Sequence, residues 1–486
     1  ADRGDLFRLS LLSKMWCDIA NPVLWESIPG FEYLWALLPA VTLSAPGRDG
    51  FRKMTFKYSP TQDDWSPVLQ RSCFVRFCGI VPDTKHPITL DFDAREQAFM
   101  VGRPPKTICP SLRELRLDLQ DYAGEIELAF MLDALLAPTL TSLNLVGCAQ
   151  PGTLSFNARQ IAVTCSNLQS MKVQVMIAND INGRLGEFFD AFAGHASLSS
   201  VTLVTWDSLC KALKSLSQIP QLSYLNLHQE PGRYAGPSEP LPRFPPGSFP
   251  SLRTLTVRGR DVSIPTIHAM IDAWDRQPFS HLHLEQINSA RWLPRLLDTT
   301  ERLERHCDHA STLDIRIHAD IYQARQVTLH DFAPLSSFPH LSILHFTNDD
   351  MASAMTDDDI GEMASWWPVI QELRIAPGGA SDLDTLPTLA SLSALARGCP
   401  RLSSLELPFG ARSAPPTVAR QLSLNKLRFM WYAPIGDPEG VAHFLRSTFP
   451  NLNRITMQAY HRKNLLLRGT YGTARAWKRV MARLAD

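Results

Sequence analysis

Side chains able to bind a metal ion gather in one short segment of this 486-residue chain, His306-Cys307-Asp308-His309. Zinc sites combine His, Cys and carboxylate ligands, usually four around one ion. On a helix only His306 and His309 would share a face, and no other ligands are spaced to join them. The segment therefore fits a solvated helix end better than a metal site, and no metal is expected.

The other polar clusters fit structural roles as well as chemical ones. In His281-x-His283, strand alternation would place both rings on one face of a sheet, which suits a surface as well as a ligand set. Asp349-Asp350 is interpreted as a loop, and Asp357–Asp359 as a helix start, where carboxylates interact favourably with the helix dipole. Phosphate-loop, dinucleotide-binding, zinc-protease and serine-hydrolase motifs are absent. The sequence predicts neither an enzyme nor a cofactor.

One sequence phrase, Leu-x-x-Leu-x-Leu with apolar substitutions, recurs along the chain. The strands and helices that it predicts must position any functional side chain. The first anchor of the phrase stands at residues 112, 140, 168, 198, 222, 252, 279, 310, 341, 370, 402, 424 and 452. Eight of these 13 copies have a proline two residues earlier, whereas 36 prolines in 486 residues would place about one there by chance. Such self-similarity is the signature of a stacked-repeat protein, and the phrase resembles that of leucine-rich repeats, whose period is about 20–29 residues.

The repeats are expected to alternate a short strand with a helix. The Leu-x-Leu end alternates as a strand does, and apolar residues at helical spacing follow in 125–136, 207–218 and 262–275. Each proline lacks an N–H and disfavours helix in the residue before it, so it stops the helix ahead of the next strand. Parallel strands with right-handed crossovers then give an α/β fold, a right-handed leucine-rich-repeat solenoid (horseshoe).

The residues between the leucine anchors are expected to form a polar concave face. Because the anchors point into the core, the alternate positions of each strand point to the opposite face of the sheet. The candidates for substrate binding on this face are Arg116, Asn144, Lys172, Tyr224, Asn226, His281, His283, His345, Glu372, Arg374, Glu406 and Arg454. A merely soluble surface is the alternative for each of them.

Composition narrows the class of protein. The chain has 48 basic and 48 acidic residues, which argues against a general nucleic-acid or membrane-surface binder. No apolar run approaches the roughly 20 residues of a membrane span, and no signal peptide is visible. Cys109, Cys165 and Cys399 stand three residues before the first anchor of their copies, just ahead of the proline position. Other copies have phenylalanine there, so these cysteines are expected to be buried. Nine scattered cysteines without a CxxC pair fit a reducing cytoplasmic or nuclear compartment.

Residues 5–28, DLFRLSLLSKMWCDIANPVLWESI, resemble the C-terminal half of an F-box. The matches are Asp5-Leu6, Leu9, Leu12-Ser13-Lys14, Trp16, Ala20 and Leu24-Trp25. The first half of the motif is absent because the chain begins too late. The combination of an F-box with leucine-rich repeats is itself a known family architecture.

The resemblance implies a docking surface for a Skp-type adaptor on a short helical partial F-box ahead of the solenoid. The residues it assigns to adaptor binding are Leu6, Leu9, Leu12, Ser13, Lys14, Trp16, Leu24 and Trp25. The alternative is an N-terminal helix that only caps the open end of the repeats, as such arrays require. On one continuous helix, Leu6, Leu9, Leu12 and Trp16 would form a single stripe.

Four segments are expected along the chain. They are a partial F-box helical region at 1–30, a linker with degenerate repeats at 31–105, the leucine-rich-repeat solenoid at 106–460 and a basic capping helix or tail at 461–486. The degenerate repeats are Phe51-x-x-Met54-x-Phe56 and Leu90-x-Phe92, and the linker is similar to that of fungal F-box proteins. Residues 231–250 contain seven prolines and are interpreted as an excursion or a partner-binding loop.

The sequence thus predicts a non-catalytic substrate-recognition subunit of a cullin–RING (SCF-type) ubiquitin ligase. The adaptor would bind at the N-terminus, and an unknown protein substrate would bind the concave repeat face. The alternative is a leucine-rich-repeat scaffold whose N-terminal helix only caps the solenoid. No membrane or nucleic-acid partner is expected.

Overall fold

The structure, a computed structural model, describes most of the chain as two compact units. The described residues are 3–47, 52–79, 88–90, 107–119, 125–147, 151–175, 184–205, 209–229, 243–259, 264–274, 279–287, 298–299, 301–305, 311–317, 326–379, 386–416, 419–430, 435–458 and 470–485. Unit 1 comprises Ala1–Leu225 and Gly232–Arg243, and unit 2 comprises Asn226–Pro231 and Phe244–Asp486. The segment His306–His309 and most of the proline-rich stretch 231–250 lie outside the described residues.

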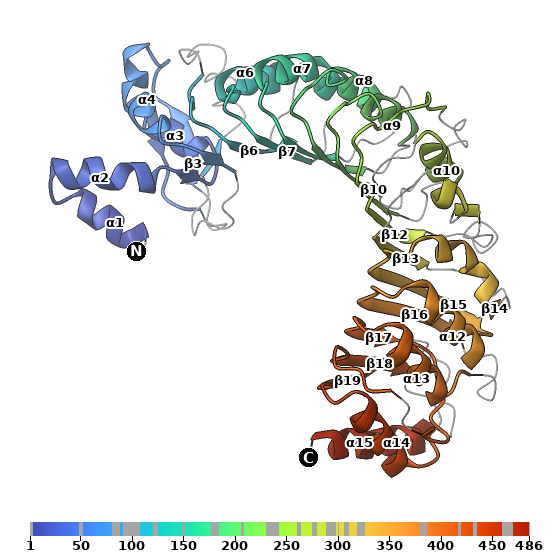
Figure 1. Cartoon of the computed structure of the whole chain (residues 1–486). Coiled ribbons are helices and arrows are strands. Elements are labelled where there is room, and N and C mark those ends of the chain that lie inside the picture. Colours follow the sequence, from blue (N-terminus) through green and yellow to red (C-terminus); the bar gives the residue numbers. More distant parts are fainter. Residues whose placement is uncertain are drawn as a thin grey trace. The chain divides into compact units, whose positions relative to one another are not determined.

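All 13 copies of the phrase form strands, and each strand begins two residues after the first anchor (Figure 1). The strands are β6 (Glu114–Asp118), β7 (Ser142–Gly147), β8 (Ser170–Val175), β9 (Ser200–Thr205), β10 (Tyr224–Gln229), β11 (Thr254–Arg258), β12 (His281–Ile287), β13 (Thr312–Ile317), β15 (Ile343–Ser353), β16 (Glu372–Gly379), β17 (Ser404–Glu406), β18 (Lys426–Met430) and β19 (Arg454–Gln458). The common start follows from the anchors, which must occupy equivalent core positions in every repeat.

Each unit carries a parallel sheet. In unit 1 the order is β1–β4–β6–β7–β8–β9, where β1 is Ser27–Ile28 and β4 is Phe77–Cys78. In unit 2 the order is β11–β12–β13–β15–β16–β17–β18–β19, and β14 (Gln326–Val327) pairs with β15. Consecutive repeats pair in register, as Leu115 with Leu143 and Leu143 with Met171. The expected α/β leucine-rich-repeat solenoid is confirmed.

Helices cover one face of the strands within each unit (Figure 1). Unit 1 has α6 (Glu125–Leu135), α7 (Pro151–Thr164), α8 (Arg184–Asp190) and α9 (Cys210–Leu216). Unit 2 has α10 (Ile264–Asp272), α12 (Asp357–Trp366), α13 (Leu389–Gly398), α14 (Pro438–Thr448) and the 3₁₀ turns η3 (Leu329–Asp331) and η4 (Ala333–Ser337). The helices expected in 125–136, 207–218 and 262–275 are present, and Asp357–Asp359 does start a helix.

The repeating proline ends the helices as expected. After α12, α13 and α14 the capping residues Trp367, Cys399 and Phe449 leave the helical region with ψ of 71°, 71° and 72°. A proline follows each of them and disfavours the helical conformation in the preceding residue. The three capping side chains are buried. The same two residues, a buried residue and the proline after it, therefore end the helix and contribute to the core.

The N-terminal part of unit 1 differs from the expected linker of degenerate repeats. β2 (Val41–Leu43), β3 (Arg52–Phe56) and β5 (Ile88–Leu90) form a separate three-stranded sheet, in which β2 and β3 are antiparallel. It is the two-residue strands β1 and β4 that join the repeat sheet. Around them lie α3 (Glu32–Trp35), η1 (Asp63–Trp65) and α4 (Ser66–Ser72). The ring of Trp35 packs edge-on against Phe31, Phe56 and Trp65 and closes this small core.

The interpretation of Asp349-Asp350 as a loop is wrong. Both residues lie inside β15, whose pairing with β16 shifts register between Asn348 and Ala352. The strand then continues and pairs with β14 through Ala352 and Ser353. The two aspartates lie at an irregularity of the strand. Polar residue types alone cannot distinguish such an irregularity from a loop.

The C-terminal helix α15 (Thr470–Ala485) packs into the core of unit 2. Trp477 and Val480 are buried, and the Trp477 ring lies 3.8 Å from that of Phe429, centroid to centroid. Its basic residues Arg475, Lys478 and Arg479 are exposed. The helix therefore combines an apolar inner face with a basic outer face.

Replacing Trp477 with alanine should destabilise the C-terminal end of unit 2. Truncating a fully buried aromatic side chain costs about 3–5 kcal/mol, because transfer and cavity terms add. The free energy of unfolding in urea measures the loss. Lys478→Ala, next to it on the exposed face, is the matched control and should change stability by less than about 0.5 kcal/mol. Equal effects of the two variants would contradict the packing described for α15.

Candidate functional site

Two helices rather than one carry the F-box-like segment. α1 (Arg3–Ser10) is followed by a turn at Leu11-Leu12, and a second helix, α2 (Lys14–Leu24), begins after it. Ser13 is the N-cap of α2, with extended backbone and a side-chain oxygen that accepts a hydrogen bond from the Trp16 N–H at 3.3 Å. Ser at the N-cap satisfies one of the free N–H groups of the first turn. The single stripe expected on one continuous helix is therefore wrong.

Apolar side chains are unusually exposed on these two helices. Of the 12 large apolar side chains that are exposed in the described residues, seven lie in this segment. We call them the apolar surface: Phe7, Leu11, Leu12, Met15, Trp16, Ile19 and Val23. Met15, Ile19 and Val23 follow one another at four-residue spacing, so they line one face of α2. Clustered exposed apolar residues mark protein-interaction sites, whereas isolated ones need no explanation.

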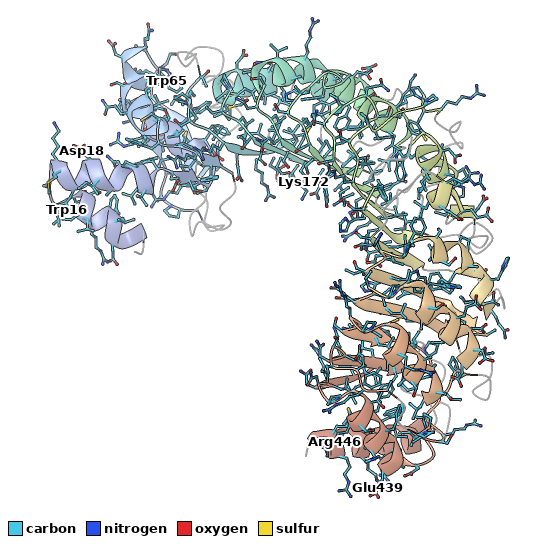
Figure 2. The ribbon with its side chains drawn as sticks, viewed as in Figure 1. Trp16, Asp18, Trp65, Lys172, Glu439 and Arg446 are labelled. Carbon is cyan, nitrogen blue, oxygen red and sulfur yellow. The ribbon has the colours of Figure 1, made fainter. Side chains whose placement is uncertain are left out.

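The eight residues assigned to adaptor binding divide into three groups. Leu12 and Trp16 belong to the apolar surface, at 70% and 39% exposure, and Lys14 is exposed beside them. Figure 2 shows Trp16 on α2, apart from the buried Trp65. Ser13 has a capping role. The remaining four, Leu6, Leu9, Leu24 and Trp25, are only partly exposed.

Trp25 has a neighbour within unit 1. The Arg71 guanidinium of α4 lies over the Trp25 ring at 5.9 Å from its centroid, a cation–π arrangement. Ala20 is the buried residue of α2. The C-terminal end of α2 is thus held to the body of unit 1, while its other face presents Met15, Ile19 and Val23 to solvent.

The polar positions of unit 1 form a continuous ladder across its strands. Arg116 pairs in register with Asn144, Asn144 with Lys172 and Lys172 with Thr202. Lys172 lies on the side of the strands away from the helices (Figure 2). Sequence spacing therefore brought Arg116, Asn144 and Lys172 correctly to one face. On β10, Asn226 stands four residues after its first anchor, as Arg116 does, and Tyr224 stands two residues after it. Tyr224 belongs to unit 1 and Asn226 to unit 2.

Unit 2 continues the same pattern with more charge. Along one row, His283 pairs with Asp314, Asp314 with His345, and His345 with Arg374. The same row continues as Arg374 pairs with Glu406, Glu406 with Arg428, and Arg428 with Thr456. In the neighbouring row, His281 stands next to Thr312, Glu372 next to Ser404, and Arg454 next to Lys426. The named candidates of unit 2 thus share one sheet face.

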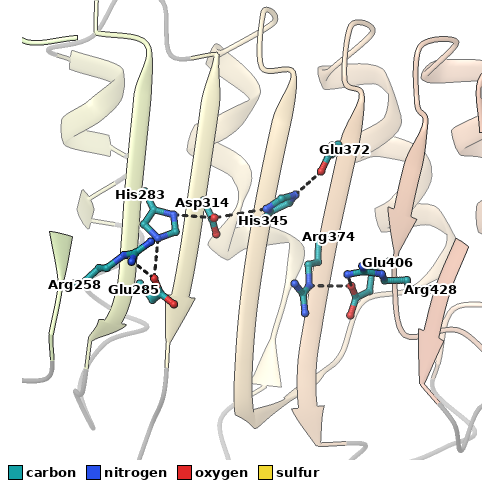
Figure 3. A network of polar contacts seen from close by, with 9 residues as sticks. All are labelled: Arg258, His283, Glu285, Asp314, His345, Glu372, Arg374, Glu406 and Arg428. Carbon is teal, nitrogen blue, oxygen red and sulfur yellow. Dashed lines mark hydrogen bonds and ion pairs between the residues drawn. The ribbon is translucent and has the colours of Figure 1, made fainter. Parts of the chain in front are cut away.

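Histidines and carboxylates alternate at the start of this face (Figure 3). Asp314 Oδ2 lies 2.8 Å from His283 Nδ1 and 3.7 Å from His345 Nδ1. The second ring nitrogen of each histidine faces another carboxylate: His283 Nε2 is 3.1 Å from Glu285 Oε2, and His345 Nε2 is 3.1 Å from Glu372 Oε2. Arg258 from β11 completes the group, with Nε 2.9 Å from Glu285 Oε2.

Further along the face, two arginines share one carboxylate. Glu406 Oε2 lies 2.9 Å from Arg374 Nε and 3.6 Å from Arg428 Nη1. The Glu406 side chain is only 8% exposed, so the two guanidinium groups supply its counter-charge. Together these nine residues, drawn in Figure 3, form what we call the charged ladder: Arg258, His283, Glu285, Asp314, His345, Glu372, Arg374, Glu406 and Arg428.

Sequence reasoning missed four members of the charged ladder. Asp314 and Arg428 stand four residues after the anchors at 310 and 424, the offset that identified His283 and Arg374. The same offset would have found them, had the copies of the phrase at 310 and 424 been treated like the rest. Arg258 and Glu285 stand two positions further along their strands, beyond the phrase itself.

The described residues hold no candidate metal cluster. Among them no three His, Cys, Asp or Glu side chains are placed to hold a metal ion. No helix in this part of the chain is long and apolar enough to cross a bilayer. Burial raises the pKa of the Cys109, Cys165 and Cys399 thiols to about 12, so they remain protonated and are poor nucleophiles. Their expected burial before the phrase is confirmed.

The rate of thiol alkylation should be lower for the buried cysteines than for the exposed ones. At about pH 8 a thiol with a pKa near 12 is ionised in roughly one molecule in 10,000, whereas an ordinary thiol is ionised in a sizeable fraction. We therefore expect iodoacetamide to modify the exposed Cys73 first and to leave Cys109, Cys165 and Cys399 unmodified until the protein is unfolded. Peptide mass spectrometry over time measures each site. Early modification of Cys165 would contradict its position in the core.

Comparison with known proteins gives no family. No family model matches the chain, and no curated protein matches it. Among solved structures, it is similar to a chain of the Rad7 and Elc1 complex in yeast, with 17% identity over 74% of this chain and 81% of that chain and a TM-score of 0.38. It is also similar to LegL7, a leucine-rich repeat-containing protein from Legionella pneumophila, with 11% identity over 76% and 91% of the two chains and a TM-score of 0.28. Similarities this low support no inference about partners.

Proposed function

We propose that the chain is the substrate-recognition subunit of a cullin–RING (SCF-type) ubiquitin ligase. The apolar surface of α1 and α2 binds a Skp-type adaptor, and the polar sheet face binds the protein to be ubiquitinated. The subunit itself performs no chemistry. It works in the cytoplasm or nucleus, where such ligases act.

The exposure of the apolar surface carries this proposal. A helix pair that only capped the solenoid would bury its apolar residues against the first repeat. Instead Met15, Ile19 and Val23 face solvent together with Leu12 and Trp16, two residues at which the segment resembles an F-box. Trp is among the residues most enriched at binding hot spots, which supports a partner for this surface.

The sheet face supports the second half of the proposal. Repeat proteins bind partners on extended surfaces built from equivalent positions of successive repeats. Here those positions hold mixed charges, from Arg116 and Lys172 in unit 1 to the charged ladder in unit 2. A substrate held on this face while the adaptor is bound would have its lysines at high effective concentration near the ligase, which accounts for function without catalysis.

Calorimetric titration of the purified chain with a purified Skp-type adaptor tests the proposal. We expect one adaptor per chain, with the negative heat-capacity change that accompanies burial of apolar surface. Absence of binding by a chain that is folded by circular dichroism would leave the scaffold alternative, in which α1 and α2 serve the solenoid alone.

A further inference from the structure

His283 lies between two carboxylates on the exposed face of β12. Its Nδ1 is 2.8 Å from Asp314 Oδ2 on the neighbouring strand β13, and its Nε2 is 3.1 Å from Glu285 Oε2 on its own strand. Both distances are within hydrogen-bond range. The ring therefore bridges the two strands through both of its nitrogens.

This geometry requires one proton more than a neutral imidazole has. A neutral ring carries a single N–H, whereas an imidazolium donates from both nitrogens and a carboxylate only accepts. The additional proton resides on the ring, because histidine is ordinarily about two pH units more basic than Asp or Glu. Arg258 Nε, at 2.9 Å from Glu285 Oε2, further favours the ionised form of that carboxylate.

The strands on both sides of β12 contribute groups to this environment. β11 supplies Arg258, and β13 supplies Asp314. β15 supplies His345, whose Nδ1 is 3.7 Å from the same Asp314 oxygen. β16 supplies Glu372, which is paired with His345. The His283 side chain is only 19% exposed, so solvent screens these interactions incompletely.

We propose that His283 is a proton-dependent clamp on the sheet face of unit 2. With the proton bound, the imidazolium joins β12 to β13 through Glu285 and Asp314. When the proton leaves, one of these carboxylates faces a lone pair of the neutral ring, and the charged ladder loses one positive charge. Without this proton, the three arginines of the ladder face its four carboxylates with less positive charge beside them.

The clamp makes stability fall as pH rises. The folded protein holds the His283 proton more tightly than the unfolded chain, where histidine titrates near about pH 6.5. The stabilisation is complete below that value and disappears as pH rises through the higher titration midpoint of the folded state. Each pH unit between the two midpoints corresponds to about a tenfold change in the folding equilibrium.

Nuclear magnetic resonance of the full chain, with ¹³C-labelled histidine rings, measures this directly. The His283 signal is assigned as the one lost in His283→Gln. We expect its titration midpoint to lie above about 6.5, the ordinary histidine value, and to fall in Glu285→Gln, which removes one of the two carboxylates. A His283 midpoint at or below the ordinary value would overturn the proposal.

Urea unfolding supplies a second measurement on the same proteins. The stability difference between the native chain and His283→Gln should shrink as pH is raised from about 6 to about 9. His281→Gln is the matched control: it lies on the same strand and its Nδ1 contacts the Ser280 hydroxyl rather than a carboxylate. A pH-independent difference for His283→Gln, or the same pH dependence for both variants, contradicts the clamp.

The consequence for partner binding rests on the proposed function. If the sheet face holds the substrate, affinity should change with the charge of His283, and Glu285→Gln should alter that pH dependence. The titration and unfolding measurements need no partner. Failure of the clamp is therefore distinguishable from failure of the receptor proposal.

Discussion

Combining Leu12→Asp with Trp16→Ala is expected to abolish adaptor binding and leave the fold intact. Leu12 is 70% exposed, so a charge there costs little stability. In the complex the same charge would be buried without a partner, which opposes binding strongly. Loss of a central tryptophan at an interface typically costs about 2–4 kcal/mol, roughly 30- to 700-fold in affinity. The two changes together should place binding below detection by calorimetry.

Val163→Asp is the matched control for this experiment. Val163 is 74% exposed on α7, far along the sequence from the apolar surface, so it also replaces an exposed apolar side chain with a charge. It should bind the adaptor as the native chain does. Circular dichroism and urea unfolding of all three proteins establish that folding is unaffected. Equal binding by the double variant and the native chain would show that α1 and α2 are not the docking site.

The repeat architecture could be predicted because its signal is local and repeated. Each copy of the phrase places buried anchors at fixed offsets, and a preceding proline ends the helix, so errors in single copies do not matter. Even the copies at 279 and 310, which match the phrase least well, form strands, β12 and β13. The polar side chains of the sheet face could be predicted from the alternation along each strand. Arg116, Lys172 and Arg374 therefore lie where the spacing placed them.

The parts that could not be predicted depend on contacts between distant residues. β1 and β4 are two residues long, too short for any periodic pattern. β4 forms because β6 offers a template for pairing, and β1 pairs in turn with β4. The pairing of Arg258 with Glu285 lies beyond the repeat phrase and depends on neighbouring strands. The sequence shows which residues share a face, but the partner of each charge is decided by side-chain geometry.

The N-terminal surface shows a different limitation. Leu6, Leu9, Leu12 and Trp16 form a stripe only if one helix runs through them, and Ser13 interrupts it. Resemblance to a motif concentrated the prediction on these matched positions. The four-residue spacing of Met15, Ile19 and Val23 was an independent signal in the same segment, and it describes the exposed face of α2 better.

Leu143→Asp is expected to unfold the repeats around β7. Leu143 is fully buried and pairs in register with Leu115 and Met171, which are buried as well. The change loses about 1.5–3 kcal/mol of side-chain burial and places a carboxylate in the core, at a further cost of several kcal/mol. That total is comparable with the roughly 5–15 kcal/mol that stabilises a typical domain.

Because each repeat contacts only its neighbours, the damage should stay local. Hydrogen exchange followed by mass spectrometry should show protection lost from β6, β7 and β8, with β16 to β18 retained. Leu422→Asp is the control: Leu422 is 59% exposed, so the same change of side chain should leave stability within about 0.5 kcal/mol of the native value. Native-like exchange in Leu143→Asp would mean that the anchors do not form the core. The assignment of the polar side chains to the sheet face, which depends on their alternation with those anchors, would then be wrong as well.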